Sequence, residues 1–155
     1  MKVKDVMTSD VKSCGLGTNL AAAAKIMWDA DCGAVPVIDD RGHVVGVITD
    51  RDICIAAATR PRSEGEIAVA DVISRTLHAC TPDDDVRTAM DKMKKQQVRR
   101  LPVIGNDGRL AGIVSLHDFA VQVRPTKNSD IRAEDVLETL VAITAPSRSR
   151  ATVSV

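Results

Sequence analysis

Two copies of a short hydroxyl-and-carboxylate motif hold the residues best suited to chemistry. Thr49 and Asp52 lie three residues apart in GVITDRDI, and Ser115 and Asp118 have the same spacing in GIVSLHDF. Apolar residues precede each hydroxyl, so a buried strand is predicted to end there and a helix to begin. The free amides and positive dipole end of a helix N-terminus attract phosphate. A carboxylate one turn further can accept hydrogen bonds from ribose hydroxyls, so each motif predicts half of a nucleotide site.

The same residues also have a purely structural interpretation. A Thr or Ser N-cap bonds the amide three residues on, and the acid at that position reaches back to the N-cap amide. This capping box is common and needs no ligand. Two features favour a site: both copies use Asp, where Glu or Gln is the better box partner, and both directly follow a buried strand. Both interpretations stay open at this point.

The motif is duplicated because most of the chain is duplicated. A shift of 66 residues aligns the sequence with itself without a gap from Asp5 to Asp118, with 11 identical pairs. Gly46, for example, meets Gly112. A repeat of this length predicts two units related by a pseudo-twofold axis and sharing one core.

Each unit predicts the same series of elements. The first helix is expected from Thr18 or Asn19 to Asp29, and its counterpart to start with Thr81 as N-cap and Pro82 at the first helical position. Another helix is expected over 130–144. In each unit, the second strand of a hairpin, here called the return strand, is apolar at nearly every position and is predicted to be buried on both faces. Strands are predicted at 34–38, 44–48, 100–104 and 110–114, with hairpin turns ending at Gly42 and Gly108.

Composition argues against several functional classes. Lys plus Arg equals Asp plus Glu at 21 each, which gives no support for a nucleic-acid or membrane surface and leaves a homodimer plausible. Trp28 and Phe119 are the only aromatic residues, so no platform for base stacking is available. The four cysteines lack metal or redox spacing, and the three histidines lack metal-ligand spacing. We expect no metal site.

The sequence also lacks signals for catalysis, secretion and membrane insertion. No nucleophile–base pair or Walker loop is present, so an enzyme is not expected. No apolar run suits a secretory leader or a membrane span, so a cytoplasmic protein with reduced thiols is expected.

The duplicated unit resembles the CBS domain, and the chain resembles a stand-alone CBS pair, or Bateman module, over about residues 3 to 123. The resemblance rests on the Asp-Val opening, the Pro-Val strand, the glycine turn and the Gly-to-Asp motif, in the same order twice. It implies an α/β (α+β) fold in which two repeats, each a small sheet with two flanking helices, pack with pseudo-twofold symmetry. The implied division is repeat 1 at 3–58, linker at 59–68, repeat 2 at 69–123, helical extension at 124–145 and disordered tail at 146–155.

The resemblance also implies a ligand. CBS pairs bind adenosine compounds between the repeats, so the expected ligand is AMP, ADP or ATP, with NAD or S-adenosylmethionine as alternatives and no cofactor required. The protein would then be regulatory and would signal to an unknown protein partner in trans. Two other readings remain: an interaction protein without a ligand that acts through dimerisation and the C-terminal helix, and a nucleic-acid binder that uses the basic residues over 92–100.

Site residues are carried over from the resemblance by position. Thr49 and Ser115 would face phosphate, Asp52 and Asp118 ribose. Basic residues near phosphate would be Arg51, Arg99 and Arg100, with His117 at the position of Arg51 in the second copy. Adenine would contact aliphatic residues and backbone near the first strands, at Val11, Lys12, Ser13, Val35, Pro36, Leu77, His78, Ala79, Leu101 and Pro102. The copies differ, so two unequal clefts are expected, and the division of the basic residues between them stays open.

Overall fold

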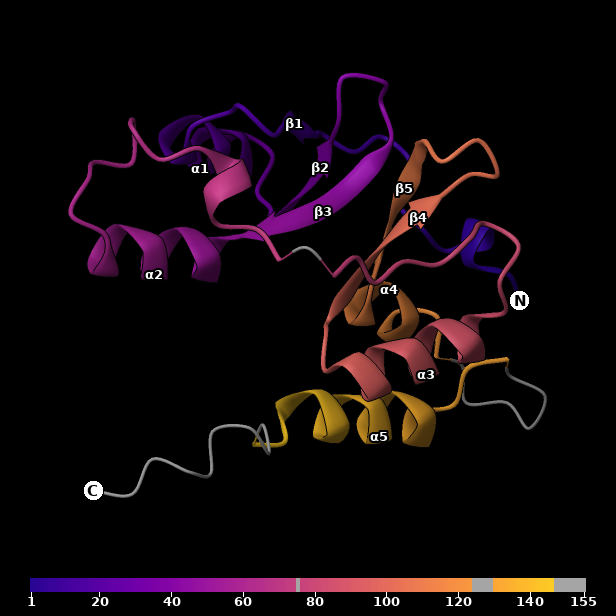
Figure 1. Ribbon diagram of the computed structural model, residues 1–155. Helices are drawn as coiled ribbons and strands as arrows, with labels where there is room; N and C mark the ends of the chain where they lie inside the picture. The colour runs from indigo at the N-terminus through magenta and orange to yellow at the C-terminus, as the bar shows by residue number, and fades with distance from the viewer. Residues whose placement is uncertain (75, 124–129, 147–155) are drawn as a thin grey trace.

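The computed structural model describes residues 1–74, 76–123 and 130–146. Figure 1 shows two similar halves, each a small sheet with helices beside it, and a last helix along the second half. The first half contains β1 (Cys14–Gly15), α1 (Leu20–Asp29), β2 (Ala34–Ile38), β3 (Val44–Thr49), α2 (Asp50–Thr59) and the short 3-10 helix η2 (Val69–Asp71). The second contains η1 (Val3–Asp5), α3 (Val86–Gln96), β4 (Arg100–Ile104), β5 (Leu110–Ser115) and α4 (Leu116–Ala120), followed by α5 (Ala133–Thr144).

The two sheets repeat the same register, which confirms the pseudo-twofold pair. The hairpins β2–β3 and β4–β5 are antiparallel, and Pro36 opposite Val47 corresponds to Pro102 opposite Ile113. The strand ranges predicted before the turns are confirmed, and each return strand is one residue longer than expected. Gly42 and Gly108 have φ values of 82° and 78°, the left-handed conformation that these turns require.

The opening segments of the two repeats are exchanged between the halves. The amide of Val3 donates to the carbonyl of Asp84 at 2.9 Å, and the amide of Val69 donates to the carbonyl of Thr18 at 2.8 Å. Val3 is therefore buried in the second half, and Val69 in the first. Each half is built from two separate stretches of chain, which ties them together.

The core differs from the expected shared one. Buried residues form two clusters, one in each half, rather than a single cluster. Cys14 and Cys80 occupy equivalent places in them, and burial raises the pKa of Cys80 to about 12. The equivalent cysteines thus serve as packing groups in the two cores.

The predicted start of the second long helix is wrong. Helix α3 begins at Val86 with Asp85 as its N-cap, not at Thr81 and Pro82. The reason lies in the exchanged segment, because the carbonyls of Pro82 and Asp84 accept hydrogen bonds from the amides of Lys4 and Val3. The amide of Val86, which a helix from Pro82 would direct to the carbonyl of Pro82, donates instead to the carbonyl of Met1 at 3.2 Å, so 81–84 forms a turn.

Other predicted elements also shift. The return strands are buried on one face only: in β3, Val44 and Ile48 are buried whereas Val45 and Val47 are half-buried, because the face with Val47 borders a cavity. The segments 11–13 and 77–79, expected near first strands, carry no strand themselves; β1 begins at Cys14. The last helix begins at Ala133 rather than 130.

Two further predictions concern the C-terminal region and membranes. The predicted break after residue 123 and the predicted disordered tail lie mostly outside the described residues. Among the helices that the structure describes, none is long and apolar enough to cross a membrane.

Candidate functional site

Both hydroxyl-and-carboxylate motifs form complete capping boxes. Thr49 is the N-cap of α2: its Oγ1 accepts from the amide of Asp52 at 3.2 Å, and Asp52 Oδ2 accepts from the amide of Thr49 at 2.9 Å and from its hydroxyl at 2.6 Å. Ser115 and Asp118 repeat this arrangement at the start of α4. The structural interpretation is confirmed for both copies, so a ligand role must rest on what surrounds them.

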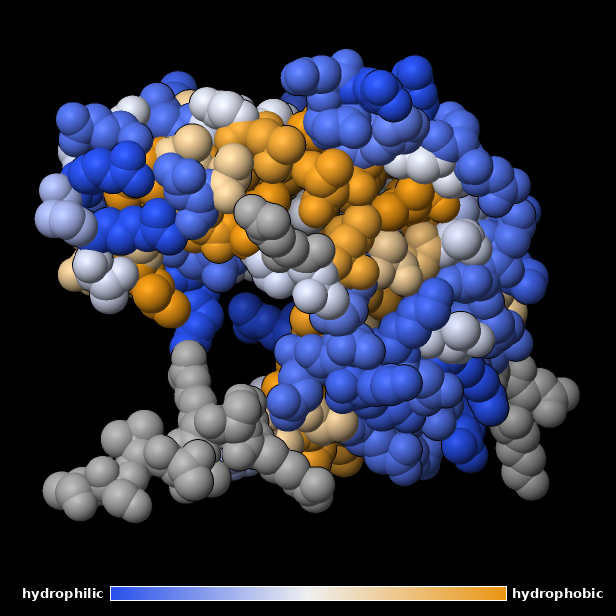
Figure 2. All heavy atoms as spheres, in the orientation of Figure 1, coloured by the Kyte–Doolittle hydropathy of each residue, from blue (hydrophilic) through white to orange (hydrophobic). Residues whose placement is uncertain are grey.

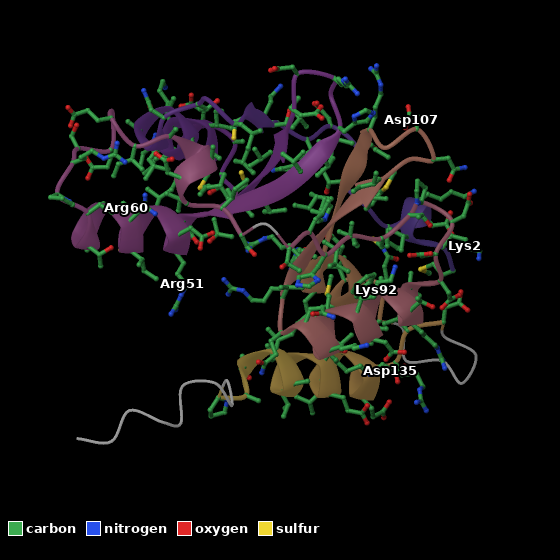
Figure 3. The ribbon with its side chains drawn as sticks, in the orientation of Figure 1. Lys2, Arg51, Arg60, Lys92, Asp107 and Asp135 are labelled. Carbon is green, nitrogen blue, oxygen red and sulfur yellow. The ribbon has the colours of Figure 1, made fainter. Side chains whose placement is uncertain are left out.

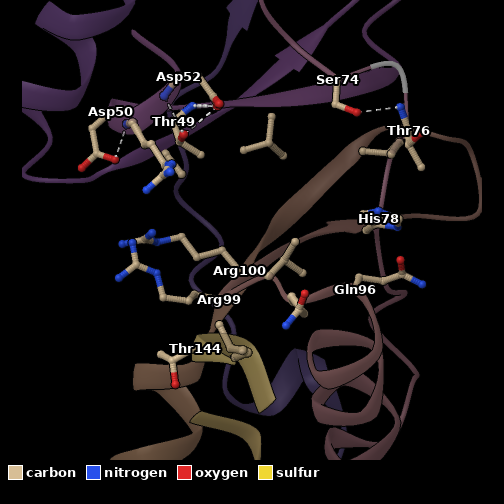
Figure 4. Close-up of a pocket in the computed structure, with 17 residues that line it drawn as sticks. Thr49, Asp50, Asp52, Ser74, Thr76, His78, Gln96, Arg99, Arg100 and Thr144 are labelled. Atoms are coloured by element: carbon tan, nitrogen blue, oxygen red, sulfur yellow. Dashed lines mark hydrogen bonds between the residues drawn. The ribbon is translucent and has the colours of Figure 1, made fainter. Parts of the chain in front are cut away.

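A cavity of about 680 Å³ lies between the halves beside the first capping box. Figure 4 shows Thr49 and Asp52 on one side and Arg99 and Arg100 on the other, with His78 from the connecting segment nearby. The space-filling view shows a hollow between the two lobes with hydrophilic residues around it (Figure 2). A concave site of this size suits a small-molecule ligand.

The cavity concentrates positive charge. Arg51 enters from the start of α2, where it points away from the first half (Figure 3), and Arg99 and Arg100 enter from the start of β4. Within the described residues, none of these arginines forms an ion pair. Three arginines against two carboxylates, Asp50 and Asp52, leave the lining with a net positive charge, which favours a bound anion, and the arginine fork suits phosphate or carboxylate oxygens.

Two lysines of the basic stretch predicted over 92–100 are paired with neighbouring acids. Lys92 Nζ donates to Asp84 Oδ2 at 2.8 Å, and Lys94 pairs with Asp91 at 2.8 Å. Burial works to raise the pKa of Asp84, but hydrogen bonds from Lys92 and Thr81 outweigh it and hold that pKa below its usual value. Lys92 and Lys94 therefore offer little net charge to a nucleic acid, in contrast to the arginines in the cavity.

The arginine side chains are divided unequally between the two repeat junctions. By the 66-residue shift, the second junction has His117 in place of Arg51, and Gly33 and Ala34 in place of Arg99 and Arg100. All three arginines thus line the cavity at the first junction. Which junction would hold the basic residues could not be read from the sequence.

The backbone at the second junction is also closer. Thr8 and Ile113 exchange hydrogen bonds of 3.0 and 2.9 Å, and a Cβ on Gly112 would lie 2.5 Å from the carbonyl oxygen of Thr8. At the first junction, a Cβ on Gly46 would lie 3.6 Å from the equivalent oxygen of Ser74. The segment before Leu77 therefore stands farther from its strand, and this side is the one that carries the large cavity.

The structure brings seven of the predicted site residues into this cavity: Thr49, Arg51, Asp52, Leu77, His78, Arg99 and Arg100. The others do not line it: Val11, Lys12, Ser13, Val35, Pro36, Ala79, Leu101, Pro102, Ser115, His117 and Asp118. Val35 and Leu101 are fully buried in the two cores, because alternate residues of a strand face opposite sides and Ala34 faces the cavity. Those two residues cannot reach a ligand there.

Sequence reasoning also missed part of the lining. Asp50 lies inside the motif, and Gln96, Gln97 and Val98 directly precede the arginine pair, so their position could have been a signal. Ile143 and Thr144 come from the end of α5, outside the repeats, and nothing in the sequence places them there.

A second cavity of about 670 Å³ adjoins the first. The two share Asp50, Arg99 and Arg100, so the arginine pair stands between them. The second is lined by Cys32 and Cys54, among others, and neither thiol is in a disulfide. No group of three or more potential metal ligands was found among the described residues.

Comparisons with known proteins agree with this architecture. The family model described as the CBS domain matches residues 3–58 and 69–124. The Bacillus subtilis protein YlbB is 33% identical over 140 residues, which cover 88% of this chain and 92% of YlbB. The CBS domain pair of protein MJ0100, solved with 5′-methylthioadenosine and S-adenosyl-L-methionine, superposes with a TM-score of 0.71 at 26% identity, over 78% of this chain and 94% of that one. The CBS domain protein TA0289 of Thermoplasma acidophilum, at 24% identity, covers 92% of this chain and 75% of its own with a TM-score of 0.77, which shows the fold alone.

Proposed function

The chain belongs to the CBS-domain family as a tandem pair, and on that premise we propose that it is a regulatory module that binds an adenine nucleotide in the cavity between its halves. The observation that carries the proposal is the convergence of Arg51, Arg99 and Arg100 beside the Thr49 capping box. A binding role suits this set of residues better than catalysis, because the cavity offers cations and a helix N-terminus, and its hydroxyl–carboxylate pair, Thr49 and Asp52, caps that helix.

The cavity offers a place for each part of a nucleotide. The phosphates would lie among the three arginines, with the start of α2 adding its dipole. The capping box uses Asp52 Oδ2, which leaves Oδ1 to accept from the ribose hydroxyls. Val47 and Leu77 are both half-buried and line the cavity, so they would contact the adenine ring. No metal or other cofactor is required for this mode.

The charge of the cavity favours AMP, ADP or ATP among adenosine compounds. The MJ0100 pair binds 5′-methylthioadenosine and S-adenosyl-L-methionine, which carry no phosphate. Three arginines, which outnumber the two carboxylates of the lining, gain little from such ligands and gain more with each added phosphate. We therefore propose the order ATP, ADP, AMP in falling affinity, with S-adenosylmethionine weaker, and NAD as an alternative dinucleotide.

The proposal includes an output. Ligand binding between the halves would change how they pack, or how two copies pack as a homodimer. An unknown protein partner in the cytoplasm would then read that change. Such a response needs a ligand that favours one packing over the other.

A second candidate function is an interaction protein without a ligand. The observation in its favour is the apolar outer surface of α5, where Leu137 and Val141 are each 61% exposed and Leu140 is 42% exposed. Exposed apolar residues grouped on one helix face are typical of an interface. In this reading the capping boxes only close their helices, and the protein acts through dimerisation and α5.

Isothermal titration calorimetry distinguishes the two candidates. The protein is titrated with AMP, ADP, ATP, NAD and S-adenosylmethionine, and thermal melts are recorded with each ligand at millimolar concentration. A nucleotide-binding module gives saturable heat and a raised melting temperature with at least one nucleotide. If every ligand leaves both measurements unchanged, the interaction protein is the better description.

A further inference from the structure

The wall of the cavity extends beyond the two repeats. Ile143 and Thr144, at the C-terminal end of α5, line it together with residues of both halves. Figure 4 shows Thr144 below Arg99, on the opposite side of the cavity from Thr49. Both α5 residues lie outside the ranges that match the CBS domain, 3–58 and 69–124. The cavity is therefore built from three parts of the chain, and the third is not a feature of the repeat.

Hydrogen bonds from one side chain, Gln97, hold the end of α5 at the cavity, in addition to the packing of the helix on the second half. Gln97 ends α3 in the left-handed conformation, with φ of 52°. Its Nε2 donates to the carbonyl of Ala142 at 3.2 Å and to that of Ala145 at 3.0 Å. Ala142 lies in the last turn of α5, where carbonyls lack amide partners within the helix, and Ala145 is the C-cap of that helix. Gln97 also lines the cavity and precedes Arg99 by two residues, so it connects the helix end to the arginine pair.

The two ends of α5 are held unequally. Before the helix, Ile131 is fully buried in the core of the second half, and Arg87 Nε donates to the carbonyl of Asp130 at 3.3 Å. Within the helix, Thr139 is the one fully buried residue. Near its end, Ile143 is only partly buried. A helix end with little buried apolar area has a low free energy of local opening, so a small added interaction shifts its position.

We propose that the C-terminal end of α5 is a third wall of the nucleotide site and that ligand binding and the docking of this end are thermodynamically coupled. A nucleotide phosphate on Arg99 and Arg100 fixes the segment 96–100, which holds Gln97 in position to bond the last carbonyls of α5. In return, the docked end places the apolar side chain of Ile143 in the wall of the cavity. Coupling of this kind is reciprocal, so each event favours the other by the same factor.

This inference rests on the proposed function and deepens it, because it identifies the element that responds to the ligand. When the end of α5 docks, the position of its outer residues Leu137, Leu140 and Val141 becomes fixed relative to the second half. The ligand signal would thus reach the surface through a helix that the repeats themselves do not contain.

Two variants test the coupling. Gln97→Asn keeps a residue that tolerates the left-handed conformation but shortens the amide so that it no longer reaches α5. Ile143→Ala removes the apolar contact at the helix end. The matched control is Val141→Ala, on the same helical turn but 61% exposed and directed to solvent. Thermal melts without ligand show whether each variant is folded.

The first measurement is the ATP affinity of all four proteins by calorimetry. We expect Gln97→Asn and Ile143→Ala each to weaken ATP binding by about 5-fold or more, the lower end of typical coupling. Val141→Ala should bind ATP as the wild type does. The second measurement is hydrogen exchange of the amides of residues 140–145, which ATP should slow in the wild type and slow much less in Gln97→Asn.

The outcomes separate the inference from the proposed function. If the wild type binds ATP and both site variants bind it equally well, with unchanged exchange at 140–145, the coupling is refuted and the nucleotide site stands. If the variants and the control weaken binding alike, the effect belongs to general helix stability and the inference is again overturned. If the wild type binds no nucleotide, both proposals fall.

Discussion

Arg51 and Arg99 belong to different repeats, yet both line the cavity beside Thr49. Their pseudo-twofold counterparts, His117 and Gly33, bring no comparable pair of charges to the other junction. Duplication therefore produced two equivalent helix caps but one cationic site. The symmetry is kept where it serves folding, in the hairpins and caps, and is broken where charge could select a ligand.

The first prediction concerns the charge in the cavity. Arg99→Gln should weaken ATP binding by at least 10-fold and AMP binding by less, because a charge-assisted contact to phosphate is worth about 1.5–3 kcal/mol. Calorimetry at low and high salt measures this, and the loss should shrink at high salt. Arg109→Gln is the matched control, since Arg109 is exposed in a hairpin and does not line the cavity. Equal losses for ATP in both variants would contradict the assignment.

The second prediction compares the two capping boxes. Asp52→Ala and Asp118→Ala each remove the N3 acid of a capping box and its hydrogen bonds, and should lower the stability by a similar amount, about 1 kcal/mol. Only Asp52→Ala should also weaken nucleotide binding, because Asp52 lines the cavity and Asp118 does not. Chemical denaturation gives the stabilities and calorimetry gives the affinities. A similar loss of affinity in Asp118→Ala would show that the second junction binds nucleotide as well.

The sequence predicted the hairpins well because their signals are local. The Pro-Val strands and the turn glycines were placed from alternation and turn chemistry alone. It failed at Thr81 and Pro82, where a good local helix start is overruled by Val3 and Lys4, residues far away in the chain. No local signal reports that the N-terminal segment occupies those carbonyls.

The residues of the candidate site were predictable from local signals, but the way in which they come together was not. The Thr49 and Asp52 pair and the arginine pair are visible in the motif and its repeat. Their meeting in one cavity depends on how the halves face each other, which a repeat alignment does not give. The place of Ile143 in the cavity could not be predicted, because α5 has no counterpart in the repeat from which its position could be inferred.

The third prediction concerns the close approach at the second junction. Gly112→Ala should destabilise the protein by roughly 2 kcal/mol or more, since the new Cβ would lie 2.5 Å from the carbonyl oxygen of Thr8 and 3.0 Å from the sulfur of Met7. Gly17→Ala is the control, because its Cβ would have no neighbour within 4 Å. Urea unfolding compares the two. A Gly112→Ala variant as stable as Gly17→Ala would mean that the N-terminal segment moves away without cost.

The last prediction is a pH dependence set by Asp84 and Lys92, which lie 2.8 Å apart. Hydrogen bonds from Lys92 and Thr81 outweigh the effect of burial and lower the pKa of Asp84 in the folded protein. A lowered folded pKa means that the unfolded chain binds more protons in acid. The pair therefore stabilises the fold above the unfolded pKa, near 3.8, and this stabilisation is lost as the pH falls through the lower folded value.

Asp84→Asn tests the sign, because it keeps the shape of the side chain and removes the charge. At pH 6 the variant should be less stable than the wild type by about 1 kcal/mol at most, since Lys92 is 40% exposed and solvent screens the pair. As the pH falls toward 3, the two unfolding curves should converge. Asp40→Asn, in the exposed hairpin turn, should show no such difference at either pH. A gap between Asp84→Asn and the wild type that widens in acid would reverse the sign and show that Asp84 is held protonated rather than charged.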